Sequence, residues 1–152
     1  MILVDANILI YATDPRSERH DQSRNWLDTQ LSGNTRVGLP WQSLLAYVRI
    51  VTNPRVFARP QSLKVAWRHV EEWLDCECAW IPVPGPTHRS LLTGLLANLA
   101  RGPKLIPDAH LAALAIEHGL ALCSSDGDFA RFNGLRWINP LAPLVPRTRP
   151  LT

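Results

Sequence analysis

Two carboxylates stand two positions apart in the stretch CSSDGDF, residues 123 to 129, after two serine hydroxyls and with a glycine between them. The apolar run Leu120 to Leu122 comes directly before this stretch, so Asp126 and Asp128 lie just past the end of a predicted buried strand. Aspartate and glycine are common turn residues, and the stretch taken alone favours ordinary turn chemistry. A catalytic role for Asp126 and Asp128 therefore depends on what else the fold brings to the same place.

Two further aspartates border apolar elements of the chain. Asp5 ends the apolar run at residues 1–4, where it could simply cap a turn. Asp108 lies near the start of the helix predicted over residues 107–118, where the helix dipole by itself favours a negative charge. If the strands are parallel, their carboxyl ends share one edge of the sheet, and the carboxylates converge there. Such a cluster repels itself unless a hard cation neutralises it, which points to Mg²⁺, with Mn²⁺ as a substitute.

Apolar runs alternate with helical periodicities along the chain. We predict strands over residues 1–4, 36–39, 120–123 and 135–138, an edge strand over 80–83, and helices over 19–31, 40–51, 62–74, 87–101 and 107–118. This alternation favours an open parallel sheet with helices on both faces. We expect one domain over residues 1–140, and a tail rich in proline and arginine over 141–152 that frays.

Composition sets further bounds. A formal net charge of +3 is compatible with an anionic partner without requiring one. The three cysteines are odd in number and poorly spaced for zinc, so we expect reduced thiols and a cytoplasmic protein. Because no apolar stretch approaches the length of a membrane span and Asp5 interrupts the N-terminal apolar run, we expect neither a membrane segment nor a signal peptide.

Three stretches resemble the acidic motifs of PIN-domain ribonucleases, and most closely those of VapC-type toxins of bacterial toxin–antitoxin pairs. They are VDANILIYA at 4–12, IPDAHLAALAIEHG at 106–119 and LCSSDGDFARF at 122–132. The resemblance runs from Met1 to about Pro140. It implies a PIN-like three-layer α/β/α fold with a central, mostly parallel sheet.

The resemblance also implies roles for individual residues. Asp5 and Asp108 become metal ligands, Asp126 contributes directly or through water, and Asp128 lies nearby as a further catalytic carboxylate. The remaining matches are supporting positions: Asn7 and Ser124 as polar support for the acids, and Phe129 as an aromatic packed beneath the loop. His110 and His118, on the helix of Asp108, are interpreted as ordinary helix residues.

One position departs from the family pattern. PIN nucleases usually carry a glutamate in the helix before an R-x-x-T-x-P segment, and Ala46 stands at that place here. Gln42 lies one helical turn earlier on the same face, and we hypothesise that its amide oxygen reaches the metal or a bound water. Without the fourth carboxylate, one tight metal site is favoured over two.

The activity implied by the resemblance is metal-assisted hydrolysis of RNA phosphodiester bonds, at single-stranded sites of tRNA, rRNA or mRNA. Trp41 could stack a base, and five basic residues are candidate phosphate contacts: Arg49, Arg55, Arg59, Arg101 and Lys104. For each of these basic residues, a solvated surface charge is the simpler interpretation.

The resemblance further implies a small VapB-like antitoxin as partner, homodimers, and higher-order assembly with the antitoxin. Six tryptophans are more than a small core needs, so some could line a partner surface. Trp41, Trp67 and Trp73 are the candidates, with core packing favoured for Trp73.

Two alternatives to an active toxin follow from the same residues. The first is a PIN-like protein that binds RNA or antitoxin with weak or no catalysis, because Ala46 replaces the glutamate. The second is a phosphoryl-transfer enzyme related to haloacid dehalogenases, which also carry an aspartate after the first strand. Those enzymes need a D-x-D motif, and Asp5-Ala6-Asn7 lacks the second acid, so the second alternative is set aside.

Overall fold

A computed structural model describes residues 1–99 and 102–143 of the chain. The elements follow in the order β1 (Ile2–Val4), α1 (Ala6–Thr13), α2 (His20–Leu31), β2 (Val37–Gly38), α3 (Trp41–Val51), α4 (Leu63–Leu74), β3 (Ala79–Trp80), α5 (His88–Ala97), the 3-10 helix η1 (Pro103–Leu105), α6 (Ile106–Glu117), β4 (Ala121–Cys123), the 3-10 helix η2 (Gly127–Arg131) and β5 (Trp137–Ile138).

All strand pairs of the five-stranded sheet are parallel, and the strand order is β3-β2-β1-β4-β5. The chain proceeds from β1 through β2 to β3 on one side, then crosses to β4 on the other side of β1. The boundary between β1 and β4 is therefore the switch point, beyond whose carboxyl ends ligands bind in sheets of this kind. The predicted parallel sheet is confirmed, with β3 and β5 as its edges.

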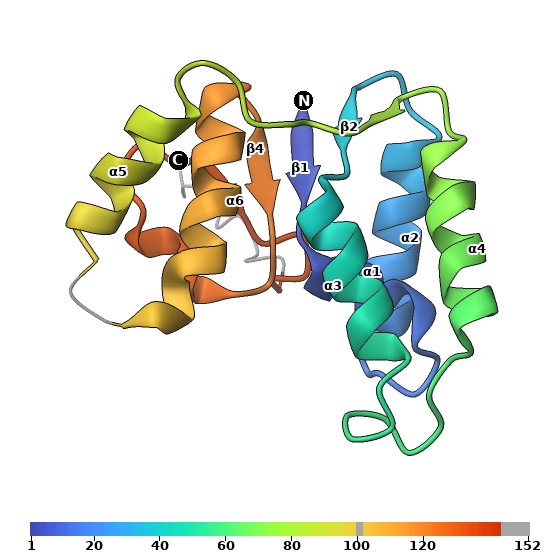
Figure 1. Ribbon diagram of the computed structural model, residues 1–152. Helices are drawn as coiled ribbons and strands as arrows, with labels where there is room; N and C mark the ends of the chain where they lie inside the picture. The colour runs from blue at the N-terminus through green and yellow to red at the C-terminus, as the bar shows by residue number, and fades with distance from the viewer. Residues whose placement is uncertain (100–101, 144–152) are drawn as a thin grey trace, which may run out of the picture.

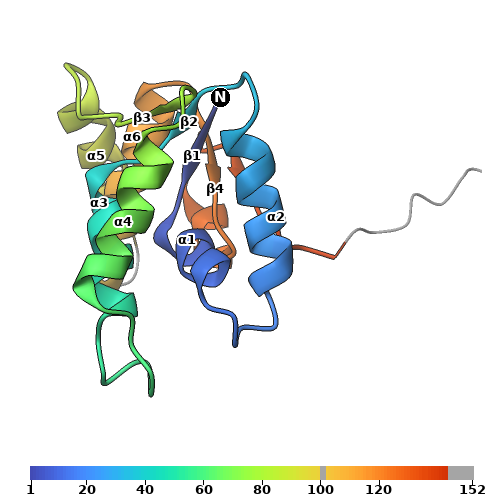
Figure 2. The ribbon, with the colours of Figure 1, turned by 90° about the vertical axis from the view of Figure 1, so that its right-hand side faces the viewer.

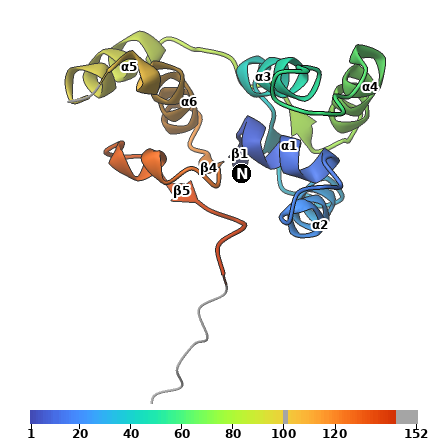
Figure 3. The same cartoon turned by 90° about the horizontal axis from the view of Figure 1, so that it is seen from below.

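The two faces of the sheet are covered by separate hydrophobic clusters. Leu3 and Val4, neighbours in β1 and both fully buried, belong to different clusters because successive strand residues face opposite sides. Val4 packs with α1 to α4, whereas Leu3 packs with α5, α6 and the aromatic rings of Phe129 and Phe132. Figures 1 and 3 show α5 and α6 on one side of β1 and β4 and α1 and α2 on the other. The predicted three-layer α/β/α fold is confirmed.

The main difference from the predicted elements is α1, which begins directly after Asp5 and was not predicted. Its residues ANILIYAT are apolar on most sides, because α1 packs against both α2 and α3. A helix covered on several sides shows no clear period of 3.6, so the sequence looks like a continuation of the apolar strand.

Some predictions fall outside the described residues. The helix predicted to continue to Arg101 is α5, which ends at Ala97, and residues 100 and 101 are not described. Most of the predicted tail, residues 144–152, is likewise outside. Within the described part of the chain, the three cysteines are free thiols, and none of the helices is both long and apolar enough to cross a membrane.

Candidate active site

Asp5 is fixed at the carboxyl end of β1 by hydrogen bonds to both of its carboxylate oxygens. Its backbone N–H donates to the carbonyl of Cys123 at 3.0 Å, at the last pair of the ladder between β1 and β4, Val4 with Cys123. Its Oδ1 caps α1 by accepting the Ala6 N–H at 2.8 Å. Its Oδ2 accepts the Ser124 hydroxyl at 2.8 Å.

Ser124 is the centre of the hydrogen-bond network between β1 and the loop after β4. Its side chain is fully buried and donates its only proton to Asp5. Its oxygen accepts from Asn7 Nδ2 at 2.9 Å and from the Asp126 N–H at 3.0 Å. The hydroxyl has no hydrogen-bonding capacity left, which fixes its rotamer and, through it, the orientation of the Asp5 carboxylate. Asn7 and Ser124 thus lie where the resemblance expects support for the acids.

Removing this hydroxyl should destabilise the protein. In Ser124→Ala the Asn7 amide and the Asp126 N–H lose their acceptor near a buried site, and we expect a loss of about 2 kcal/mol in the free energy of unfolding. Urea unfolding followed by circular dichroism measures this change. Ser125→Ala is the matched control, since no hydrogen bond of the Ser125 hydroxyl occurs among the described residues. Equal stabilities of the two variants would contradict a central role for Ser124.

Asp126 lies directly before η2, and Asp128 lies in the first turn of η2. Asp126 caps η2 by accepting the Asp128 N–H at 2.9 Å, and Phe129, only 1% exposed, anchors the turn in the core. Asp128 forms an ion pair with Arg131, Oδ1 to Nε 3.2 Å, that the sequence analysis did not anticipate. The acids therefore have one cation nearby, and Asp128 is the least available of them as a metal ligand.

Asp108 lies in the first turn of α6, near enough to the other three carboxylates for their charges to act on it. Its pKa is raised from 3.8 to about 6, first by burial and then by the charges of Asp5, Asp126 and Asp128. Burial also raises the pKa of Asp5, with the Asp126 charge adding to it, although the hydrogen bonds from Ser124 and Ala6 oppose the shift. Asp5, Asp108 and Asp126 therefore lie close enough for their charges to repel one another.

The donor set suits a hard divalent cation. It consists of carboxylate oxygens, which Mg²⁺ and Mn²⁺ prefer, and the repulsion among them is what such a cation relieves. Across residues 1–99 and 102–143, no three side chains of His, Cys, Asp or Glu already stand close enough to ligate one ion together. Mg²⁺ usually keeps several waters and is bound through one or two carboxylates, so a compact cage is not needed.

Ala46 and Gln42 lie on α3 across from the start of α6. Together with Leu45 and residues of α6, they line a cavity of about 520 Å³ between the two helices. Gln42 Nε2 donates to the carbonyl of Pro107 at 2.9 Å, which ties α3 to the residue just before Asp108. In the described part of the chain, the Gln42 amide oxygen accepts no hydrogen bond and stays available to a bound water or cation.

We expect Gln42→Ala to weaken Mn²⁺ binding about tenfold, because Gln42 positions the backbone beside Asp108 and offers an oxygen of its own. Isothermal titration calorimetry gives the affinity. Gln22→Ala is a matched control, since Gln22 Nε2 likewise donates to a proline carbonyl, that of Pro140, at 3.5 Å. Unchanged Mn²⁺ affinity in Gln42→Ala would remove Gln42 from the site.

The predicted nucleic-acid and partner residues are mostly on the surface. Arg49, Arg55 and Lys104 are exposed, whereas Arg101 lies outside the described residues. Trp41 and Trp67 are 43% and 38% exposed, while Trp73, at 9%, is part of the core. These positions are compatible with the predicted roles, which remain predictions.

His110 of α6 and His118, the residue directly after α6, have partners within the protein. His110 Nδ1 lies 3.1 Å from Nε2 of His88, and His118 Nε2 lies 2.7 Å from the carbonyl oxygen of Val83. His88 also lies 3.4 Å from the carboxylate of Glu117. This cluster could not be predicted from the sequence, because its members come from α5 and α6 without a recognisable spacing.

Carboxylates from β1, α6 and the loop after β4 thus meet at the switch point of a parallel α/β/α sheet. The family model described as PIN domain matches residues 2–135. The chain belongs to the PIN domain family.

Curated relatives with high similarity are named as VapC ribonucleases. Ribonuclease VapC37 of Mycobacterium tuberculosis is 44% identical over 144 residues, which cover 95% of this chain and 100% of that protein. Ribonuclease VapC33 of the same species is 38% identical over 141 residues, 93% of this chain and 99% of that protein.

Solved structures with the same fold include VapBC2 from Rickettsia felis bound to a DNA fragment from its promoter. The TM-score is 0.66 at 18% sequence identity, and the match covers 91% of this chain and 98% of that chain. FitAcB from Neisseria gonorrhoeae also gives a TM-score of 0.66 at 18% identity, covering 92% and 98%. At this identity the likeness concerns the fold alone.

Proposed function

We propose that this protein is the toxin of a type II toxin–antitoxin pair and acts as a Mg²⁺-dependent endoribonuclease. Its substrates are single-stranded sites in tRNA, rRNA or mRNA. The proposal rests mainly on the position of Asp108 near Asp5 and Asp126, where burial and then the charges of Asp5, Asp126 and Asp128 raise its pKa to about 6. The VapC ribonuclease names of relatives up to 44% identical support the same activity.

In the proposed reaction, Asp5, Asp108 and Asp126 would hold the cation. The cation, when bound, lowers the pKa of a water and neutralises charge that develops on the phosphate in the transition state. Ser124 keeps the Asp5 carboxylate oriented, so the oxygens need little rearrangement as the substrate arrives. Asp128, half-exposed and only partly engaged by Arg131, is positioned to accept a proton from the attacking water.

A cysteine nucleophile is an unsuitable alternative at this place. Cys123 precedes Ser124 and is the only thiol of the strand that ends at the acids. Burial raises its pKa to about 12, so it stays a neutral thiol at physiological pH. The thiolate is the nucleophilic form of cysteine, which leaves hydrolysis by water as the chemistry that the site favours.

The proposed partners are RNA and a VapB-like antitoxin. Arg49, Arg55 and Lys104 would contact phosphates, since all three side chains are exposed. The cavity between α3 and α6 and the exposed ring of Trp41 offer apolar surface for a helix of the antitoxin. We further propose a cytoplasmic homodimer that assembles into larger complexes with the antitoxin.

Incubation of the purified protein with total RNA and Mg²⁺ or Mn²⁺ tests the activity. We expect discrete cleavage products that disappear when EDTA removes the metal. Unaltered RNA under all conditions would contradict the endoribonuclease.

A second candidate function rests on Ala46, which leaves the cavity wall without the carboxylate usual in the family. In that case the protein binds RNA or antitoxin with little or no catalysis. Ala46→Glu distinguishes the two, because it should create cleavage in an inactive protein but only modify cleavage that already exists.

A further inference from the structure

A second cavity, lined by apolar surface together with two arginines, lies at the ends of α1 and α3, away from the acids. It has a volume of about 210 Å³. The residues that bear on its chemistry are Thr13, Asp14, Arg16, Phe57, Arg59 and Gln61. Pockets that bury whole drug-sized ligands are usually about 300–1,000 Å³, so this one suits a smaller group such as one nucleobase.

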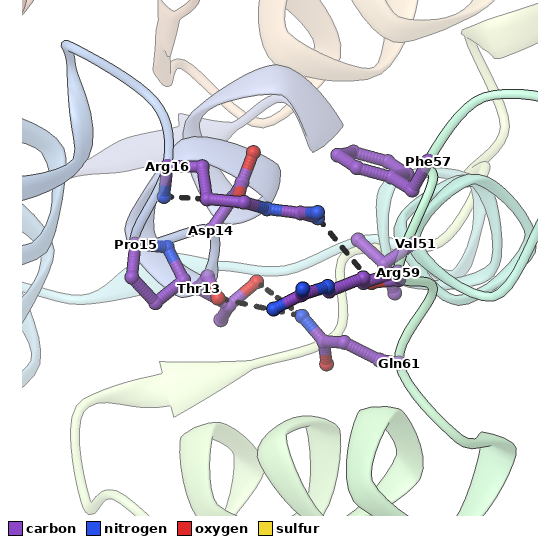
Figure 4. Close-up of a pocket in the computed structure, with 8 residues that line it drawn as sticks. All are labelled: Thr13, Asp14, Pro15, Arg16, Val51, Phe57, Arg59 and Gln61. Atoms are coloured by element: carbon purple, nitrogen blue, oxygen red, sulfur yellow. Dashed lines mark hydrogen bonds and ion pairs between the residues drawn. The ribbon is translucent and has the colours of Figure 1, made fainter.

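Arg16 lies over the ring of Phe57 at one side of this cavity. Its guanidinium carbon lies 5.8 Å from the ring centroid of Phe57, which itself packs against the core. Arg16 Nε lies 3.3 Å from Asp14 Oδ1, and Nη2 donates to the carbonyl of Arg59 at 3.3 Å. These contacts, visible in Figure 4, leave a guanidinium plane and an aromatic ring fixed beside the open space. Such planes stack bases of single-stranded RNA.

The polar wall is anchored in the core as well. Gln61 Nε2 donates to Thr13 Oγ1 at 3.1 Å and to the Thr13 carbonyl at 3.4 Å. Its Oε1 accepts the hydroxyl of the fully buried Tyr47 at 3.3 Å. Because both ends of the amide are engaged, the wall is preorganised and little side-chain entropy is lost on binding.

The charges around the cavity favour one anionic group. Asp14 neutralises Arg16, whereas Arg59 forms no ion pair with any carboxylate of residues 1–99 and 102–143. In Figure 4 the side chain of Arg59 extends along the cavity toward Thr13 and Gln61. One unpaired guanidinium beside a stacking surface matches one phosphate and one base, the components of a nucleotide.

The cavity faces the same end of the molecule as the acids. The loop between α1 and α2 and the loop between α3 and α4 both lie at the carboxyl end of β1 (Figures 1 and 2). Helix α1 begins next to Asp5 and ends at Thr13, so about 12 Å separates the two sites along the helix, at 1.5 Å per residue. One extended RNA strand can reach both.

We propose that the cavity formed by Arg16, Phe57, Arg59 and Gln61 is a nucleotide subsite that binds one unpaired RNA residue away from the scissile phosphate. The base stacks on the Arg16 guanidinium, whose other face lies over the ring of Phe57, and Arg59 contacts the phosphate. The subsite rests on the proposed ribonuclease function for its biological role, and it would contribute to the choice of cleavage site. Nucleotide binding there is independent of metal and of cleavage.

Titration of ¹⁵N-labelled protein with the four ribonucleoside 5′-monophosphates in EDTA, followed by NMR, tests the subsite. We expect saturable shifts at the backbone amides of Thr13 and Arg16 and at the side-chain amide of Gln61. Inorganic phosphate and the free nucleosides should bind at least about fivefold more weakly than the best nucleotide, because neither makes both contacts. Shifts confined to the surroundings of Asp5, or no saturable shifts, would overturn the proposal.

Variants separate the two contacts. Arg59→Ala should raise the nucleotide Kd about tenfold, whereas Arg89→Ala, an exposed arginine on α5, should leave it unchanged. Phe57→Leu keeps an apolar side chain and should weaken nucleotide but not phosphate binding. An equal loss of nucleotide affinity in Arg59→Ala and Arg89→Ala would indicate non-specific electrostatic attraction and would reject the subsite. Tighter binding of a hexaglutamate peptide than of any nucleotide would assign the cavity to a protein partner and would also reject the subsite. Nucleotide binding without RNA cleavage would reject only the proposed function.

Discussion

Asp5→Asn is expected to reduce metal-dependent RNA cleavage by about 1,000-fold, which corresponds to about 4 kcal/mol of transition-state stabilisation. Asp5 is the most firmly positioned of the acids, with Oδ1 bound to Ala6 and Oδ2 to Ser124. Asparagine occupies the same volume but lacks the charge that a cation needs. Single-turnover cleavage of RNA at saturating Mg²⁺ measures the effect.

The asparagine variant should keep its fold. Loss of the hydrogen bond that the Ser124 hydroxyl donates to Asp5 lowers the free energy of unfolding by about 1 kcal/mol. Removal of the charge repulsion between Asp5 and Asp126 offsets part of this loss. Circular dichroism spectra that match those of the unmodified protein provide the control. If the folded variant cleaves RNA at the normal rate into the same products, the nuclease activity does not come from this rim.

Asp108→Asn should have opposite effects on activity and stability. Cleavage should fall as in Asp5→Asn, whereas the metal-free protein should gain stability at pH 7.5. The pKa of Asp108 is raised from 3.8 to about 6 by burial and by neighbouring carboxylates, so its ionised form is disfavoured in the folded state. A pKa difference of about two corresponds to about 3 kcal/mol in the free energy of unfolding. Because Asp108 is only half-buried and solvent screens its charge, we expect Asp108→Asn to gain about 1 kcal/mol in this free energy.

The pH dependence of stability follows from the same shift. Between pH 3.8 and about 6 the folded protein holds the Asp108 proton and the unfolded chain has released it. Stability from this group is therefore fully present below pH 3.8 and is lost as the pH rises through about 6. Urea unfolding in EDTA across this range should show a decline that is smaller in Asp108→Asn. Glu18→Gln, at an exposed position before α2, is the control. If Asp108→Asn is less stable than the unmodified protein at pH 7.5, the proposed repulsion between Asp108 and the neighbouring carboxylates is contradicted.

The arrangement of the sheet could be predicted because short apolar runs alternate with amphipathic helices. Helices α2, α3, α4 and α6 lie within one residue of their predicted ends, since turn residues or prolines mark them. Helix α1 was missed because its burial against α2 and α3 removes the polar face that reveals a helix. Strands β3 and β5 have two residues each and are held mainly by pairing with the neighbouring strands. The order of apolar and polar residues along the sequence does not reveal this pairing, so the bounds of these strands could not be predicted.

The acidic rim could be predicted for a different reason. Asp5 and Asp126 follow strands that are parallel neighbours, so the carboxyl ends of these strands place them together. The pair of Asp128 with Arg131 was missed although a spacing of three residues permitted it. The cavity beside Arg16 and Phe57 could not be predicted, because it joins two loops about forty residues apart whose approach depends on the packing of α1 against α3.

The gathering of Asp5 and Asp108 around one divalent cation is tested most directly by Mn²⁺ titration of the unmodified protein, Asp5→Asn and Asp108→Asn. We expect one tight Mn²⁺ per chain in the unmodified protein, and affinities at least about 100-fold weaker in both variants, because each removes a charged oxygen ligand of the same ion. Wild-type affinity in either variant would show that these two carboxylates do not share a cation.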